Sequence, residues 1–349
     1  GRFTPANAME YNISLLFTDK PTPLWYYASH AVEFVVLVFF LTQILKRYTS
    51  DRRWIYLIIA LLALTPGFTY SWFRLQLNER DVLLFMAAFL YCYFRFQDSQ
   101  RTTWLALASI AAAIAIYYKE TGFILVGVYA SAHMILSWRN GERDTRIWAF
   151  DAVLLTAALS YVLLYSALVL PSGGVFVYGK GDLPAAEVLI KNFLNYLFVS
   201  DPVIILMVLP LTLWRVYRVF VRGDRAEPFY DALLASASLF VAAYFVLNLF
   251  GFYYFQPVYV LAIPPLFHFI KERIGLKPWR YASIAAATLV ALNSVPTGLH
   301  YLTYYKYAPT NFNATIDSLV RDIKTRFPDR RANIFIDGVD RGSGKFTYF

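Results

Sequence analysis

The sequence predicts an all-α polytopic membrane protein with about ten transmembrane helices and, after them, the beginning of a small outward α/β segment. Of its 349 residues, 58% are hydrophobic and only 16% are charged, whereas about 25% of residues are charged in an ordinary soluble domain. The 30 Phe, 27 Tyr and 8 Trp lie mostly in or beside apolar runs that are too long for soluble core helices. The net charge of +9 comes from short basic clusters between these runs, so nucleic acid is not an expected partner.

Ten apolar segments have the composition of membrane helices, and they follow one another along most of the chain. They cover residues 25–45, 54–72, 82–96, 103–118, 122–138, 147–170, 203–221, 229–250, 252–269 and 279–300.

The loops between these segments alternate in charge. Five of them hold 17 lysines and arginines, whereas the other four hold five. By the positive-inside rule, the first set faces the cytoplasm, so both visible chain ends and the second set face outward. The predicted parts are therefore an outward N-terminal loop (1–24), a transmembrane domain (25–300) and an outward soluble segment (301–349), with a helix near 315–327 and a short strand at 332–339.

The longest outward loop, 171–202, begins with a Gly-rich stretch and continues as AAEVLIKNFLNYLF. In a helix over 185–198, the apolar side chains share one face, while Glu187 and Lys191 give the segment a polar side. This pattern predicts a helix that lies on the membrane surface, among the membrane lipids.

The remaining composition excludes several kinds of site. The single cysteine, Cys92, cannot form an intrachain disulfide, and the four histidines are scattered, which disfavours zinc. No P-loop, dinucleotide fingerprint or Ser/His/Asp order is evident. The chain begins with Gly1, without a signal peptide, so we expect a further segment to precede it.

Ionisable residues on the predicted outward side are the candidates for chemistry, because charges near a membrane are costly. The first cluster is RLQLNERD, which joins the second and third segments and contains Arg74, Glu79, Arg80 and Asp81. Its two carboxylates can hold a divalent cation or take a proton, and its two guanidinium groups can bind a phosphate. The alternative is a solvated loop that neutralises itself.

The second cluster is the turn YYKETG, in which only Lys119, Glu120 and Thr121 join two segments. Segments of this length span about 24 to 26 Å, less than the roughly 30 Å of hydrocarbon, so the turn should lie at or below the headgroup plane. A lysine there suits an anionic lipid headgroup or a lipid phosphate. The alternative is a local ion pair that permits a tight hairpin.

Further candidates are Glu10, in the N-terminal segment, and the pair His30 and Glu33, three residues apart just inside the first helix. An intramembrane glutamate indicates function by default, but a hydrogen bond from Glu33 to His30 that closes a helix contact is the favoured interpretation. His133 and His268 lie near cytoplasmic helix ends, where packing or interfacial roles are expected.

Four stretches resemble the polyprenyl-phosphate-dependent membrane glycosyltransferases of the GT-C type, which include protein O-mannosyltransferases and lipid A aminoarabinose transferases. GRFTPANAMEYNIS is similar to the end of their first outward loop, and NERDVLLFMAAFLYCYF to their outward acidic residue with its apolar helix. IAIYYKETGFILVG resembles their helix, Lys-Glu or Lys-Gly turn, helix element, and FYYFQPVYVLAIPPLF their aromatic, Pro-rich helix entry. The family's first helix and catalytic aspartate would lie before Gly1, and Tyr253 and Tyr254 stand where a basic residue often precedes the Pro-rich entry.

This resemblance implies transfer of a sugar, with inversion, from a polyprenyl-phosphate lipid donor to a glycan, lipid or protein acceptor at the outer face, often with a divalent metal such as Mg or Mn. Lys119, Arg74 and Arg80 are then the expected ligands of the donor phosphate. Glu79, Asp81 and Glu120 are the expected catalytic carboxylates, because an acceptor hydroxyl needs a base.

Two other classes of protein remain open. A transporter or lipid flippase would need polar residues along a path across the membrane, whereas the ionisable groups here crowd the outward side. A non-catalytic structural subunit of a membrane assembly would need none of these clusters.

The orientation predicts which loops a membrane-impermeant reagent reaches. In intact cells, cysteines introduced by Arg143→Cys and Arg222→Cys should resist thiol labelling from outside, because both positions belong to the basic, cytoplasmic set of loops. Labelling of either position without permeabilisation would overturn the orientation.

Overall fold

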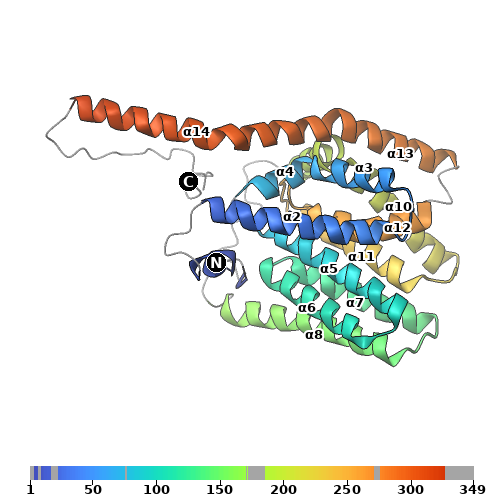
Figure 1. The fold of residues 1–349 in the computed structure, drawn as a ribbon. Helices are drawn as coiled ribbons and strands as arrows, with labels where there is room; N and C mark the ends of the chain where they lie inside the picture. The colour runs from blue at the N-terminus through green and yellow to red at the C-terminus, as the bar shows by residue number, and fades with distance from the viewer. Residues whose placement is uncertain are drawn as a thin grey trace.

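The computed structural model describes residues 4–6, 9–16, 23–74, 77–169, 171, 185–270 and 276–326. Within these residues the fold is a bundle of helices without strands (Figure 1). The α-helices are α1 (Met9–Leu15), α2 (Pro23–Leu45), α3 (Arg52–Ala63), α4 (Pro66–Phe73), α5 (Asn78–Ser99), α6 (Thr102–Tyr118), α7 (Gly122–Arg139), α8 (Thr145–Leu168), α9 (Ala185–Asn195), α10 (Leu209–Val216), α11 (Pro228–Val246), α12 (Gln256–Ile270), α13 (Lys277–Leu289) and α14 (Val295–Arg326). Short π-helical stretches are η2 (Tyr196–Ser200), η3 (Ile204–Val208), η4 (Tyr217–Val221) and η5 (Val290–Ser294).

Local sequence explains where several of these helices begin and end. Asp51 and Asp144 cap α3 and α8, each accepting a hydrogen bond of 2.9 Å from a backbone N–H in the first turn. Gln100 ends α5 in the left-handed conformation, with φ of 56°. Pro66 cannot continue α3, because it lacks an N–H and its ring collides with the preceding turn, and α4 leaves at 69° to α3.

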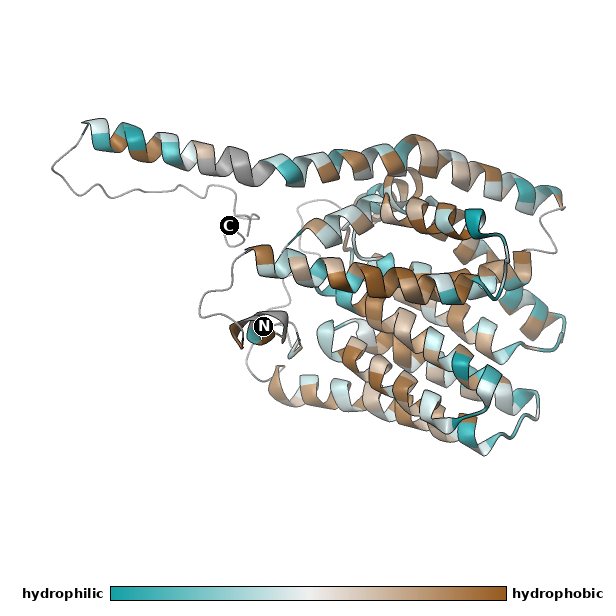
Figure 2. Cartoon of the chain, viewed as in Figure 1, coloured by the Kyte–Doolittle hydropathy of each residue, from teal (hydrophilic) through white to brown (hydrophobic). Residues whose placement is uncertain are grey.

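α5 lies at the centre of the bundle and contacts α2, α4, α6 and α12, while α7 packs between α8 and α11. The hydropathy is highest along the middle of the helices and lowest at the loops (Figure 2). α14 contacts α4 closely, since a Cβ atom at Gly298 would collide with the Leu64 carbonyl at the break between α3 and α4. Beyond this contact, α14 extends past the bundle (Figure 1).

The prediction of ten membrane spans is not supported. Five helices among the described residues are long and apolar enough to cross a membrane, or six if the bent pair α3 and α4 forms one span. α6 and α12 are apolar but have only 17 and 15 residues. α5 begins with three ionisable residues, Glu79, Arg80 and Asp81, so its apolar part is shorter than the helix. The plainer conclusion is a helical protein with several candidate membrane spans.

The C-terminal prediction also changes. The helix expected near 315–327 is the end of α14, which runs without interruption from Val295 to Arg326. The expected strand at 332–339 lies outside the described residues, so the α/β segment is not supported.

The helix expected over 185–198 is present as α9 followed by η2, with Leu189, Ile190 and Phe193 exposed. Its location on a membrane surface stays a prediction.

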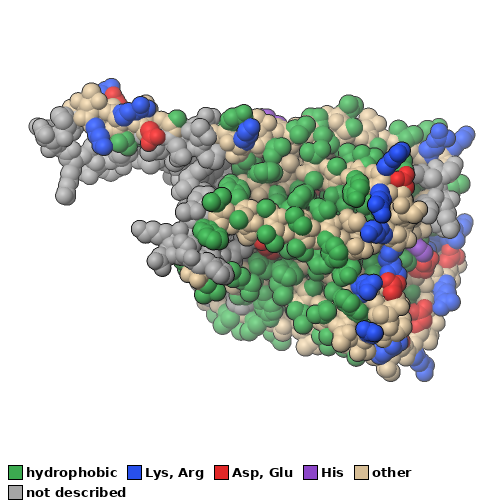
Figure 3. Space-filling model, viewed as in Figure 1, with side chains coloured by type: hydrophobic (Ala, Val, Ile, Leu, Met, Phe, Trp, Pro, Cys, Tyr) green, Lys and Arg blue, Asp and Glu red, His purple; other side chains and the backbone are tan. Residues whose placement is uncertain are grey.

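Charged side chains gather at one end of the bundle, on the right in Figure 3, and hydrophobic side chains cover the middle. We call the end with the charged side chains the Arg215 end; η4 ends there and α11 begins there. The opposite Lys119 end is where α5 begins, α6 ends and α7 begins. α7, with 18 residues, joins the two ends.

Candidate functional site

The first turn of α5 carries three consecutive ionisable side chains into the interior of the Lys119 end. Glu79, Arg80 and Asp81 are only 3%, 0% and 5% exposed. Successive residues of a helix point about 100° apart, so these side chains meet different neighbours. Glu79 faces the turn between α6 and α7, and Arg80 faces α2.

The Lys119 ammonium forms an ion pair with Glu79, with 2.8 Å between Nζ and Oε1, and lies 4.0 Å from Glu120 Oε1. Both partners of the closer pair are buried, since Lys119 is 7% exposed. Asn78 Nδ2 donates to the Tyr118 carbonyl over 2.6 Å and fixes the end of α6 against the start of α5. Glu79 and Lys119, 40 residues apart in the sequence, therefore meet in the folded protein.

Glu79 determines the charge state of Lys119. Burial by itself would lower the pKa of Lys119, but the Glu79 carboxylate, the Tyr244 hydroxyl and Glu120 raise it, and the net shift is upward. Because the folded pKa lies above that of a free lysine, this group's contribution to stability is fully present below about pH 10 and is lost only at higher pH. Lys119 is therefore a cation at neutral pH.

Tyrosines surround this ion pair. The Lys119 ammonium lies 5.5 Å from the ring centroid of Tyr254, a cation–π distance. Tyr253 stacks on Tyr70, with ring centroids 5.0 Å apart. Arg74 donates to the hydroxyl of Tyr70. The Lys119 end thus combines buried charge with an aromatic wall.

Arg80 forms a second cluster on the α2 side of α5. Its guanidinium lies 2.6 Å from Glu33 Oε2 and 3.8 Å from Asp81 Oδ2, and Nη1 donates to His30 Nε2 over 2.6 Å. His30 Nδ1 then donates to the Trp72 carbonyl, and Trp72 Nε1 returns a bond to the His30 carbonyl.

The structure therefore places the predicted residues in two groups. Arg80 contacts both His30 and Glu33, where a direct bond between those two was the favoured interpretation. The carboxylates of Glu33 and Asp81 both lie near Arg80, so the positive charge of Arg80 is already compensated within the protein. Asp81 belongs to this group and not to the Lys119 group. The side chain of Glu10, in α1, lies outside the described residues.

The two groups together hold more acid than base: Lys119 and Arg80 face Glu79, Glu120, Glu33 and Asp81. The Lys119 ammonium is close to both Glu79 and Glu120, so it already pairs with the carboxylates that could hold a divalent cation. Among the described residues there is no group of three or more His, Cys, Asp or Glu side chains that could hold a metal. The donor set present here does not make a divalent metal site by itself.

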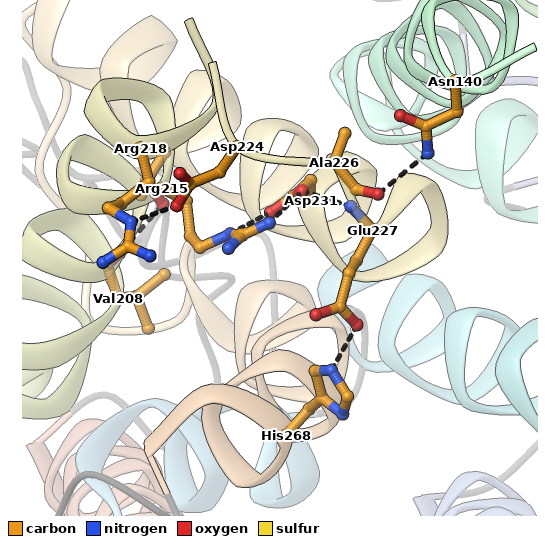
Figure 4. Close-up of polar contacts among 10 residues, drawn as sticks. Asn140, Val208, Arg215, Arg218, Asp224, Ala226, Glu227, Asp231 and His268 are labelled. Carbon is orange, nitrogen blue, oxygen red and sulfur yellow. Dashed lines mark hydrogen bonds and ion pairs between the residues drawn. The ribbon is translucent and has the colours of Figure 1, made fainter. Parts of the chain in front are cut away.

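The Arg215 end contains ionic contacts that sequence reasoning missed (Figure 4). Arg215 binds Asp231 through two hydrogen bonds of 2.6 and 2.7 Å and joins α10 to α11. Glu227 pairs with His268, which also stacks on Tyr230 at 3.9 Å, so His268 has a packing role. Asn140 donates to the Ala226 carbonyl over 2.9 Å and ties in α7. These residues hold helices together.

Two further acidic residues were also missed. Asp151 is buried in α8 and lies 2.7 Å from His133 Nδ1, and a lone aspartate in the apolar run IWAFDAVLL was the available signal. Asp201, between η2 and η3, is 3% exposed. Its position next to Pro202 suggested only a loop end.

The fold and the site define a helical protein with several candidate membrane spans and a buried ionic site at one end of its bundle. Comparison with protein-family models, curated proteins and solved structures finds no match.

The buried ion pair predicts that Lys119 resists amine acylation at about pH 10, where an ordinary lysine is half deprotonated. Lys46 and Lys306, which are exposed, should be modified under the same conditions and serve as internal controls. Peptide mass spectrometry after brief labelling measures each site. Glu79→Gln should make Lys119 reactive, and modification of Lys119 at the rate of Lys46 in the unchanged protein would disprove the pairing.

Proposed function

We propose that this protein is a membrane glycosyltransferase that moves a sugar from a polyprenyl-phosphate lipid to an acceptor at the outer face of the membrane. The observation that carries the proposal is the buried, positively charged Lys119 close to two carboxylates at the end of a bundle of apolar helices. A lipid phosphate presents its charge at the end of a membrane helix, where this ammonium lies.

Lys119 contacts the donor phosphate in this proposal, and Glu79 is the positioning residue that holds its side chain in the turn. Arg74, beside Tyr70, contributes a second cation for the phosphate. Arg80 does not bind the phosphate in this proposal, because its guanidinium already contacts Glu33 and Asp81. Its role is to hold α5 in position. These roles place the donor headgroup against the turn between α6 and α7.

Glu120 is the catalytic base of the proposed reaction. Its side chain is 20% exposed, whereas that of Glu79 is 4% exposed, so an acceptor can reach Glu120 more easily. The acceptor oxygen attacks the anomeric carbon, the bond from that carbon to the phosphate oxygen breaks, and polyprenyl phosphate leaves. The acceptor's proton passes to Glu120, which loses its negative charge as the departing phosphate gains one.

The tyrosines of the Lys119 end supply the surface for the sugar. The ring of Tyr253 contacts the rings of both Tyr70 and Tyr254. Aromatic faces bind the apolar faces of sugars while the tyrosine hydroxyls remain able to form hydrogen bonds.

A structural subunit of a membrane assembly is the second candidate, and one observation favours it. α14 extends beyond the bundle (Figure 1), and its far end bears charged, exposed residues such as Arg321 and Asp322. A helix that leaves its own bundle can contact another protein. Absence of transfer from every polyprenyl-phosphate sugar tested would favour this role.

The double variant Glu79→Gln/Lys119→Met should lose donor use without leaving a buried charge unpaired. A charge-assisted bond contributes about 1.5 to 3 kcal/mol, so transfer at low donor concentration should fall roughly 10 to 150-fold. Transfer is measured in membranes with equal amounts of folded protein. The control is Arg47→Gln/Asp98→Asn, which removes an ion pair of 2.9 Å between the turn that follows α2 and the last turn of α5. Equal losses in both double variants, or no loss in the first, would contradict the proposal.

A further inference from the structure

The turn that joins α7 to α8 forms an open pocket at the Arg215 end of the bundle, where charged side chains gather (Figure 3). Its volume is about 530 Å³, within the range of about 300 to 1,000 Å³ that is typical of small-ligand sites. The pocket is lined by Trp138, Gly141, Glu142, Arg143, Thr145 and Trp148.

The local sequence explains the shape of this turn. The backbone N–H of Gly141 donates to the Trp138 carbonyl over 3.0 Å and ends α7. Gly141 has a φ of 73°, which glycine adopts without strain. Trp148 Nε1 then donates to the Glu142 carbonyl over 3.2 Å, so the first turn of α8 is fixed against the turn. One tryptophan thus lines the pocket from α7 and the other from α8.

Arg143 supplies the uncompensated charge of the pocket. Glu142 forms an ion pair of 3.2 Å with Arg225, and Asp144 forms one of 2.8 Å with Arg146. The guanidinium of Arg143 is exposed and has no ion-pair or hydrogen-bond partner among the described residues. The pocket therefore presents a net positive charge that is available to an anion.

The position of the pocket along the helices corresponds to the level of lipid headgroups. α8 is a candidate membrane span from Thr145 to Leu168, and Thr145, its first residue, lines the pocket. Trp138, in the last turn of α7, is 72% exposed. Tryptophan is enriched where membrane helices enter the headgroup region, because its ring is apolar and its N–H is polar.

Apolar surface continues from the pocket toward the middle of the bundle. Ile135 lies one turn before Trp138 on the same face of α7 and is 56% exposed. A lipid tail can lie along this surface, whereas a small soluble anion would gain nothing from it. The combination of a cation, two indole rings and an adjoining apolar strip therefore favours a lipid.

We propose that this pocket binds the headgroup of an anionic phospholipid, for which phosphatidylglycerol is the probe. The Arg143 guanidinium binds the lipid phosphate through paired hydrogen bonds. The rings of Trp138 and Trp148 contact the glycerol backbone, and an acyl chain lies along Ile135. This binding does not depend on the transfer reaction proposed for the Lys119 end.

The test is a titration of the purified protein in detergent with phosphatidylglycerol or phosphatidylcholine, in roughly 0.1 M ammonium acetate. Native mass spectrometry measures the bound lipid. Phosphatidylglycerol should bind more tightly than phosphatidylcholine. Arg143→Gln should weaken its binding about fivefold, because a basic residue at an anionic lipid surface contributes about 1 kcal/mol. Trp138→Ala should weaken the binding of both lipids without a change of charge. Both side chains are exposed, so both variants should fold.

Arg52→Gln is the matched control. It removes the same charge from an exposed arginine at the start of α3, which lies at the same end of the bundle (Figure 1) but outside the pocket. It should leave the binding of phosphatidylglycerol unchanged. Equal affinity for the two lipids, an undiminished affinity in Arg143→Gln, or an equal loss in Arg52→Gln would overturn the proposal. Displacement of phosphatidylglycerol by an equal concentration of soluble glycerol phosphate would also overturn it, because the ligand would then be a soluble phosphate ester.

Discussion

The buried ion pair between Glu79 and Lys119 is the interaction on which the Lys119 end of the bundle depends. Removing two charges from water costs several kcal/mol per ion, so such a pair persists only when both partners are held at contact distance. Here the turn between α6 and α7 holds Lys119, and the first turn of α5 holds Glu79. The central helix α5 is thereby fixed against the hairpin of α6 and α7.

Arg80 extends the same constraint to the other side of α5. Glu33 and His30 bring α2 to the guanidinium, and Trp72 connects α4 to His30 through paired hydrogen bonds. One turn of α5 therefore organises four neighbouring elements. At the opposite end, Arg215 and Asp231 join α10 to α11 in the same way. Many of the interhelical charge contacts lie near the two ends of the bundle, and the middle is largely apolar (Figure 2).

Hydropathy and turn chemistry predicted much of this fold. Helices occupy the ten expected places, because apolar runs separated by short polar loops leave few alternatives. The predicted number of ten membrane spans was not supported, because hydropathy alone does not separate a helix that crosses lipid from one that is short or packed inside the bundle, as α6 and α12 illustrate. The sequence predicted that a membrane helix ends at His300, where the composition becomes polar, and that a separate helix lies near 315–327. In the structure α14 runs through both stretches, because a polar helix can continue an apolar one.

The sequence predicted which charged residues belong to the candidate site, but it did not predict which of them form ion pairs with one another. Charged residues in a loop and a turn at one side of the membrane identified Glu79 and Lys119, and antiparallel neighbours brought them together. Whether Arg80 turned toward Lys119 or toward α2 depended on the rotation of α5, which the loop sequence does not determine. Asp201 and Tyr259 are far apart in sequence, and only the folded arrangement of η3 and α12 brings them together.

A double-mutant cycle on the free energy of unfolding tests most directly whether the Glu79–Lys119 pair holds the site. Glu79→Gln and Lys119→Met should each destabilise the protein by about 3 to 5 kcal/mol, because each leaves a buried charge without its partner. The double variant should lose clearly less than the sum of the two, with a coupling energy of at least about 1 kcal/mol. Additive losses, or single losses within about 0.5 kcal/mol of zero as at a solvated surface pair, would contradict the account.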